Sequence, residues 1–126
     1  MTAIGARRIL LLGTENADGT VTGVTTGQSV PVNALGFGAH TFYFRSVGTT
    51  SGGTVTIEEA DWGPREAPYA GTWQNLATIS ASTFTGTKET TSVLALSAYG
   101  YLRVNIVATI TGGGSILASV VMQEHG

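Results

Sequence analysis

The stretch YLRVNIVATIT, residues 101–111, decides the fold class. Its apolar residues occupy every second position, namely Leu102, Val104, Ile106, Ala108 and Ile110. Successive side chains of a β-strand point to opposite faces, so this period of two predicts a strand with one buried face. A helix would scatter the same residues around its circumference. We therefore expect one long strand over residues 101–111.

The same alternation, rich in β-branched residues, continues on both sides of this strand. It predicts further strands at residues 8–13, 20–25, 28–33, 41–45, 54–58, 73–80, 91–96 and 115–123. Pro31 indicates a sheet edge or a bulge, because proline has no N–H to donate. Residues 90–98 lack alternation and fit either a doubly buried strand or a short helix. Eight or nine short strands in one domain predict an antiparallel β-sandwich, and we expect a jelly roll.

Glycine-rich segments separate several of the expected strands: Asn16–Gly19, Gly52-Gly53 and Gly112–Gly114. Glycine and Asx residues supply the positive φ of tight turns, so we interpret all three segments as hairpin turns. Two stretches share a layout, in which a strand with aromatic residues and arginine, residues 42–45 or 101–103, leads through a Thr/Gly turn into a β-branched strand. Convergent composition explains this likeness, whereas a true repeat would place two equivalent hairpins in opposed sheets.

The composition is poor in charge. Asp, Glu, Lys and Arg make up 11% of the 126 residues, against about 25% in a typical soluble domain. A surface of hydroxyl groups and glycine suits a protein packed against its own copies or a partner. Six scattered basic residues and a net charge of −2 argue against nucleic-acid binding. Without cysteine, disulfides and thiol catalysis are excluded, and no apolar run approaches the length of a membrane span.

Catalytic groups are sparse in the sequence. Histidine occurs only at positions 40 and 125, and we expect His40 to be a surface residue at a strand end. Glu58 and Glu59 should point to opposite faces of one strand, which argues against a shared acid–base or metal site. We interpret these two carboxylates, with Asp61, as a solvated strand end. We accordingly expect no enzymatic activity, no cofactor and no bound metal.

Contact residues are more readily proposed. We expect a short N-terminal arm, residues 1–8, and a long loop rich in proline and glycine, residues 61–71. Trp73 and three phenylalanines, Phe42, Phe44 and Phe84, are expected in the core. Arginine and aromatic residues outside the core are the usual anchors of protein interfaces. The candidates for a partner interface are Arg7, Arg8, Trp62, Arg65, Tyr69, Tyr99, Tyr101 and Arg103.

Three short stretches carry a resemblance to a known family: GTWQNLATIS at 71–80, YGYLRVNI at 99–106 and ITGGG at 110–114. Together they resemble the small β-rich virion proteins of tailed bacteriophages, and among these the capsid decoration or cement proteins. The resemblance implies a homotrimer on the capsid surface, made in the host cytoplasm and bound to the major capsid protein. We expect no nucleic-acid or membrane partner, and the resemblance identifies no specific site residues in this chain.

Two other functions stay open on the sequence. One is a tail, fibre or head-fibre module of the virion. The other is a carbohydrate-binding β-sandwich module, because exposed Trp and Tyr side chains often stack on sugars, with Trp62 as the residue to test.

Overall fold

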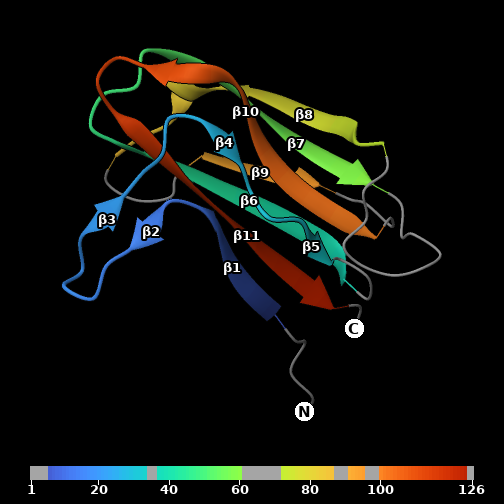
Figure 1. The fold of residues 1–126 in the computed structure, drawn as a ribbon. Coiled ribbons are helices and arrows are strands. Elements are labelled where there is room, and N and C mark those ends of the chain that lie inside the picture. Colours follow the sequence, from blue (N-terminus) through green and yellow to red (C-terminus); the bar gives the residue numbers. More distant parts are fainter. Residues whose placement is uncertain (1–5, 34–36, 61–71, 87–90, 96–99, 125–126) are drawn as a thin grey trace.

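The computed structural model describes residues 6–33, 37–60, 72–86, 91–95 and 100–124, which form a sandwich of antiparallel β-sheets (Figure 1). Within these ranges the one helical element is a 3₁₀ turn, η1 (Ala81–Thr83). The prediction of an all-β, antiparallel sandwich is thus confirmed. No described helix has the length and hydropathy needed to cross a membrane.

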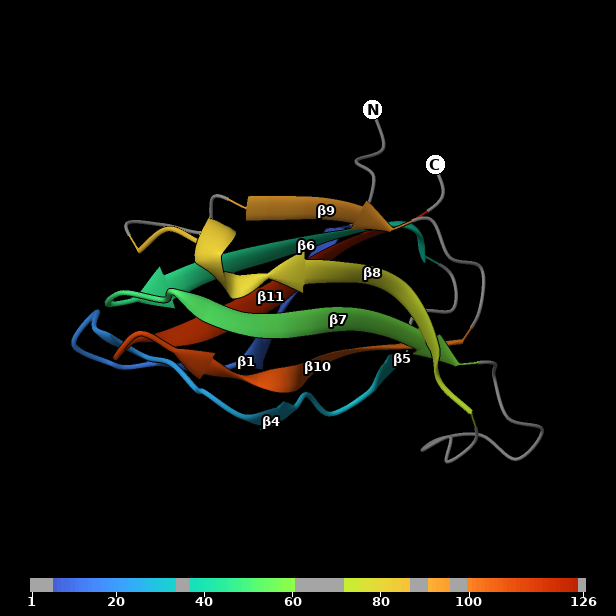
Figure 2. The same cartoon turned by 90° about the horizontal axis from the view of Figure 1, so that it is seen from above.

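Two sheets form the layers of the sandwich, which Figure 2 shows from above. The first contains, in spatial order, β1 (Ala6–Leu12), β11 (Ser115–Glu124), β6 (Phe37–Val47) and β9 (Thr91–Ala95). The second contains β4 (Gly27–Gln28), β10 (Tyr101–Thr111), β7 (Gly52–Ala60) and β8 (Gln74–Ser80), with β5 (Val32–Asn33) also paired to β10. A small third sheet is the hairpin of β2 (Thr14–Glu15) and β3 (Val21–Thr22).

The hydrophobic core lies between the two layers and follows the period-two pattern. Both central strands of each layer contribute fully buried side chains, among them Phe42, Phe44, Val55, Ile57, Leu102, Val104, Ile116 and Val120. Phe84, just after η1, stacks on Phe44 with ring centroids 5.0 Å apart. The long strand expected over residues 101–111 is confirmed as β10, and alternate burial along it is the reason that the two layers adhere.

We predicted hairpin turns at the glycine segments near residues 52 and 112, and this prediction is wrong. β10 and β11 belong to different sheets, and so do β6 and β7, so each connection crosses from one layer to the other. β6 pairs with β11 and β7 pairs with β10, which brings the two crossings together. The Ser51 N–H donates to the Thr111 carbonyl at 2.9 Å. A Cβ on Gly112, which has φ of 108°, would lie 2.6 Å from the Ser51 nitrogen, so only glycine fits there.

Other segments refine the sequence predictions. The expected arm at residues 1–8 is partly wrong, because β1 begins at Ala6 and pairs with β11 from Ala6↔Gln123 through Arg8↔Val121. Pro31 separates β4 from β5 at the edge of the second sheet, as expected of a residue without an N–H. Of the two alternatives for residues 90–98, residues 91–95 form a strand, β9. The loop at 61–71 lies outside the described residues.

Candidate partner interface

The two outer faces of the sandwich differ in chemistry. We call the outer side of the second sheet the β7 face, defined by Thr56, Glu58, Trp73, Arg103 and Asn105. We call the outer side of the first sheet the β6 face, defined by Arg8, Leu10, Thr41, Tyr43, Arg45, Ser119 and Val121. Except for Trp73, which precedes β8 and lies against Arg103, these positions alternate with the core residues of the same strands, and the strand registers place them side by side.

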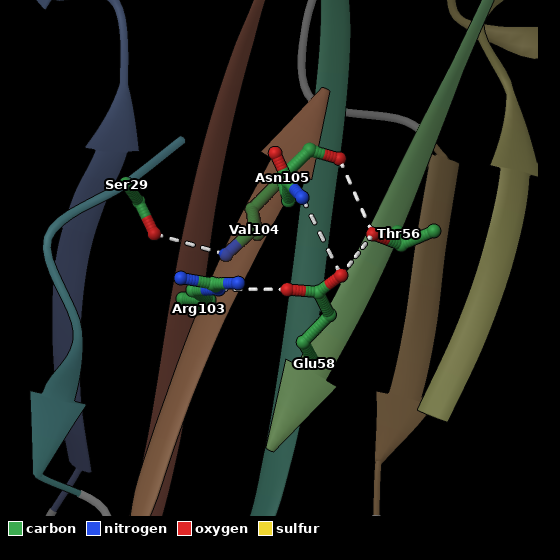
Figure 3. A network of polar contacts seen from close by, with 6 residues as sticks. All are labelled: Ser29, Thr56, Glu58, Arg103, Val104 and Asn105. Atoms are coloured by element: carbon green, nitrogen blue, oxygen red, sulfur yellow. Dashed lines mark hydrogen bonds and ion pairs between the residues drawn. The ribbon is translucent and has the colours of Figure 1, made fainter. Parts of the chain in front are cut away.

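A network of polar contacts occupies the centre of the β7 face (Figure 3). Arg103 lies directly opposite Glu58 in the register of β10 and β7, and its Nε donates to Glu58 Oε1 at 2.7 Å. The Thr56 hydroxyl donates to Glu58 Oε2 at 3.0 Å, and Asn105 Nδ2 donates to the same oxygen at 3.4 Å. The two charged side chains are only 16% and 13% exposed. Both carboxylate oxygens are thus satisfied within the chain.

Trp73 completes this network from the side of β8. The Arg103 guanidinium carbon lies 4.2 Å from the Trp73 ring centroid, a cation–π contact. We had expected Trp73 in the core, and that prediction is wrong, because its side chain is half-buried on the outer face beside Arg103. The indole and the carboxylate together hold one guanidinium in a fixed orientation.

A serine fastens the sheet edge beside the same strand. The Val104 N–H donates to the Ser29 hydroxyl at 2.9 Å, and the Ser29 N–H donates to the Val104 carbonyl at 2.8 Å (Figure 3). Ser29 is buried and lies between β4 and β5, two residues before Pro31. Its hydroxyl accepts the hydrogen bond from the Val104 N–H that a backbone carbonyl would accept in a continuous edge strand.

The β6 face carries an arginine in a different situation. Arg45 Nη2 donates to the Gly86 carbonyl at 3.0 Å, and its Nε is buried without a hydrogen-bond partner. Its register partner on β11 is Leu117, which is 1% exposed and offers no acceptor. No carboxylate of the described residues forms an ion pair with Arg45. The face therefore holds a positive charge beside apolar and hydroxyl side chains.

The β2–β3 hairpin stands out from the body at the end of the sandwich where the two crossings lie (Figures 1 and 2). Its turn is closed by the Asn16 N–H donating to the Thr20 carbonyl at 2.8 Å, which confirms the turn predicted at residues 16–19. At the tip, Asp18 Oδ1 accepts from the Thr20 hydroxyl at 2.6 Å and from the Thr20 N–H at 3.0 Å. These two hydrogen bonds lower the pKa of the Asp18 carboxyl below its ordinary value of 3.8.

The residues predicted from the sequence to form a partner interface, apart from Tyr101, fall into three groups. Arg103 belongs to the network of the β7 face, and exposed Arg8 pairs with Glu15 at 3.0 Å. Arg7 lies in β1 opposite Met122, and its side chain is outside the description. Four candidates lie wholly outside the described residues: Trp62, Arg65, Tyr69 and Tyr99.

Tyr101 departs from its prediction. We expected it on the polar, exposed face of its strand, but it is only 2% exposed. It lies in register between Ala60 on β7 and Asn33 on β5. Its ring is therefore not part of the outer surface.

Two further expectations are wrong on burial. Glu58 and Glu59 do point to opposite faces, but neither is a solvated strand end, since Glu58 is paired with Arg103 and Glu59 is 7% exposed. His40 is fully buried and lies opposite Met122, because β6 begins at Phe37, earlier than the predicted strand. Sequence reasoning missed Arg45, for which an arginine within an aromatic strand was the available signal.

Comparison with known proteins found no match among family models, curated proteins or solved structures.

Proposed function

We propose that this chain is a structural protein of a virion, a capsid decoration or cement protein of a tailed bacteriophage. As a homotrimer on the capsid surface it binds the major capsid protein and spans the joints between capsid subunits. Its action is mechanical, because surface buried across a joint opposes separation of the two subunits that share it.

The strand order supports the finer fold within this proposal, a jelly roll. One sheet runs β1-β11-β6-β9 and the other runs β4-β10-β7-β8, with β5 beside β10. From β5 onward, consecutive strands thus lie in different layers in every case except β7–β8, and the first and last long strands, β1 and β11, pair with each other. This arrangement fits eight strands wound as two interlocked Greek keys, a fold common in viral capsid and lectin domains.

The β6 face is the observation that carries the functional proposal. Among the described residues the second sheet lies on the opposite side of this sheet, and on the β6 face Tyr43, Thr41 and Val121 are half-buried and Ser119 is fully buried. A sheet face of hydroxyl, aromatic and aliphatic groups costs little to dehydrate, whereas a face of charges would resist docking. Only Arg8 and Arg45 bring charge to the defining positions of this face.

Binding to capsids tests the proposal directly. Purified protein is mixed with expanded empty heads that lack it, and the heads are pelleted and analysed for bound protein. We expect saturable binding with a fixed ratio to the major capsid protein, and heads that resist heat or low salt better than undecorated heads. Absence of binding to heads, with the protein located on tails by immunogold labelling, would move the assignment to a tail or fibre module.

A carbohydrate-binding role has a candidate in Trp73, now placed on an outer face. The Arg103 guanidinium already stacks on the ring, so that side of the indole is closed to a sugar. A glycan array with the wild-type chain, Trp73→Ala and Trp62→Ala separates this role from the structural one. Binding lost in either variant would favour it.

A further inference from the structure

We infer that the β6 face binds the β2–β3 hairpin of a second copy of this chain, with the Asp18 carboxylate of that copy reaching Arg45. This inference rests on the proposed function and deepens it, because it names the contact that joins the copies of the oligomer.

The argument begins with the unsatisfied guanidinium. An arginine has five N–H donors and stays charged at any physiological pH. Arg45 spends one donor on the Gly86 carbonyl, and its buried Nε has no acceptor. Buried donors are nearly always paired in folded proteins, and no described residue offers this Nε an acceptor, so we look for the acceptor on another molecule. A carboxylate is the acceptor that matches the charge and the fork of a guanidinium.

The surroundings indicate a protein partner. Tyr43 and Val47 lie on the same side of β6 as Arg45, and both are half-buried. Leu117, its register partner, is fully buried under the segment at Gly13, whose added Cβ would lie 2.8 Å from Leu117 Cγ. A small anion would leave Tyr43 and Val47 partly exposed to water, whereas a protruding peptide turn would cover them while delivering one charge.

The β2–β3 hairpin has the properties of that turn. It stands out from the sandwich (Figure 1), and the five residues between its strands, 16–20, are all exposed. Thr20 fixes Asp18 through Oδ1 alone, which leaves Oδ2 open and the carboxyl ionised at neutral pH. Glu15, the other acid of the hairpin, is engaged by Arg8 of its own chain.

The symmetry of this contact agrees with the expected assembly. The hairpin of one copy meets a different surface, the β6 face, on the next copy. Such a contact between unlike patches is heterologous, and it closes into a ring when the rotation permits. A ring of three copies uses every hairpin and every Arg45 once.

A charge exchange tests the pair. We would prepare Arg45→Asp, Asp18→Arg and the double variant, and measure assembly by sedimentation velocity over a dilution series. Each single variant should weaken assembly about tenfold or more, and the double variant should recover most of that loss. Gln28→Asp is the matched control, because it adds a charge at an exposed position of the other sheet and should leave assembly unchanged. Arg45→Met, with thermal melts of all variants, separates lost contact from lost folding.

Each remaining result has a definite meaning. A wild-type oligomer that both single variants preserve, or that the double variant fails to recover, overturns the Asp18–Arg45 contact but leaves the decoration role intact. A wild-type monomer that still binds heads overturns the contact between copies. A wild-type chain that neither assembles nor binds heads overturns the proposed function as well.

Discussion

The β7 face and the β6 face each place an arginine on the outer side of a β-sheet, but the two arginines have different hydrogen-bond and ion-pair partners. Arg103 faces Glu58 across β10 and β7 and is stacked on Trp73. Arg45 faces Leu117 across β6 and β11 and has a buried nitrogen without a partner. The cross-strand neighbour makes the difference, because Glu58 offers Arg103 a carboxylate and Leu117 offers Arg45 no acceptor. On the β7 face the arginine is paired with a carboxylate, whereas on the β6 face the arginine has a buried Nε without an acceptor.

Removal of the Glu58 carboxylate should give the largest effect. Glu58→Ala leaves the Arg103 guanidinium largely buried without a counter-ion, and deprives Thr56 and Asn105 of an acceptor. We expect a loss of about 2–3 kcal/mol in the free energy of unfolding, below the value for a fully buried pair because both side chains retain some solvent. Urea denaturation followed by tryptophan fluorescence measures it. Glu58→Gln, which keeps the acceptor oxygen, should lose about 1 kcal/mol. Equal losses in both variants would contradict the hydrogen-bonding part of this account, and no loss in Glu58→Gln would contradict the ionic part.

Truncation of Trp73 should have the next largest effect. Trp73→Ala removes a half-buried ring and its contact with Arg103, for an expected loss of about 1–2 kcal/mol. Trp73→Leu retains part of the apolar area without the π system. Chemical denaturation, followed by circular dichroism because the main fluorophore changes, gives both values. If Trp73→Leu recovered nearly all of the loss seen in Trp73→Ala, apolar area, and not cation–π attraction, would account for the contact with Arg103.

Neutralising Arg45 should cost little in the isolated chain. Arg45→Met keeps the aliphatic stem and loses one hydrogen bond, to the Gly86 carbonyl. Because no carboxylate is left behind, we expect a change within about 1 kcal/mol, of either sign. The measurement is urea denaturation at a dilution where the wild-type chain is monomeric. A loss as large as that of Glu58→Ala would mean that the two faces are alike after all.

The smallest effect concerns the titration of Asp18. Hydrogen bonds from Thr20 depress the pKa of this carboxyl in the folded chain, so its contribution to stability is present above its ordinary pKa of 3.8 and disappears as the pH falls through the lower folded value. Carboxyl ¹³C NMR should give a midpoint below 3.8. Thr20→Val removes the hydroxyl and should raise that midpoint toward the ordinary value. An unchanged midpoint would refute the assigned cause.

Local pattern was sufficient to predict the strands. Alternation at 101–111, 54–58 and 115–123 located β10, β7 and β11, because burial on one face leaves a period of two in the sequence. Which sheet a strand joins is not a local property. Gly112–Gly114 has the composition of a hairpin turn, yet it links different layers because β11 pairs with β6, far away in the chain.

The candidate site was harder to predict for a related reason. Trp73 and Tyr101 exchanged their expected environments, because the burial of a ring depends on tertiary neighbours that the local alternation does not specify. The orphan status of Arg45 likewise follows from its register with Leu117. No motif in the sequence encodes that pairing.

The two adjacent crossings have a consequence for synthesis of the chain. β6 and β7 precede their partners β11 and β10 by some half of the polypeptide, so their inner edges stay unpaired until the last strands leave the ribosome. Contacts so distant along the chain slow the search for the native state, and folding in milliseconds to seconds is typical of such topologies. Truncation before β10 should therefore yield no folded fragment. The last two strands therefore complete both layers late in synthesis, because β10 pairs with β7 and β11 pairs with β6.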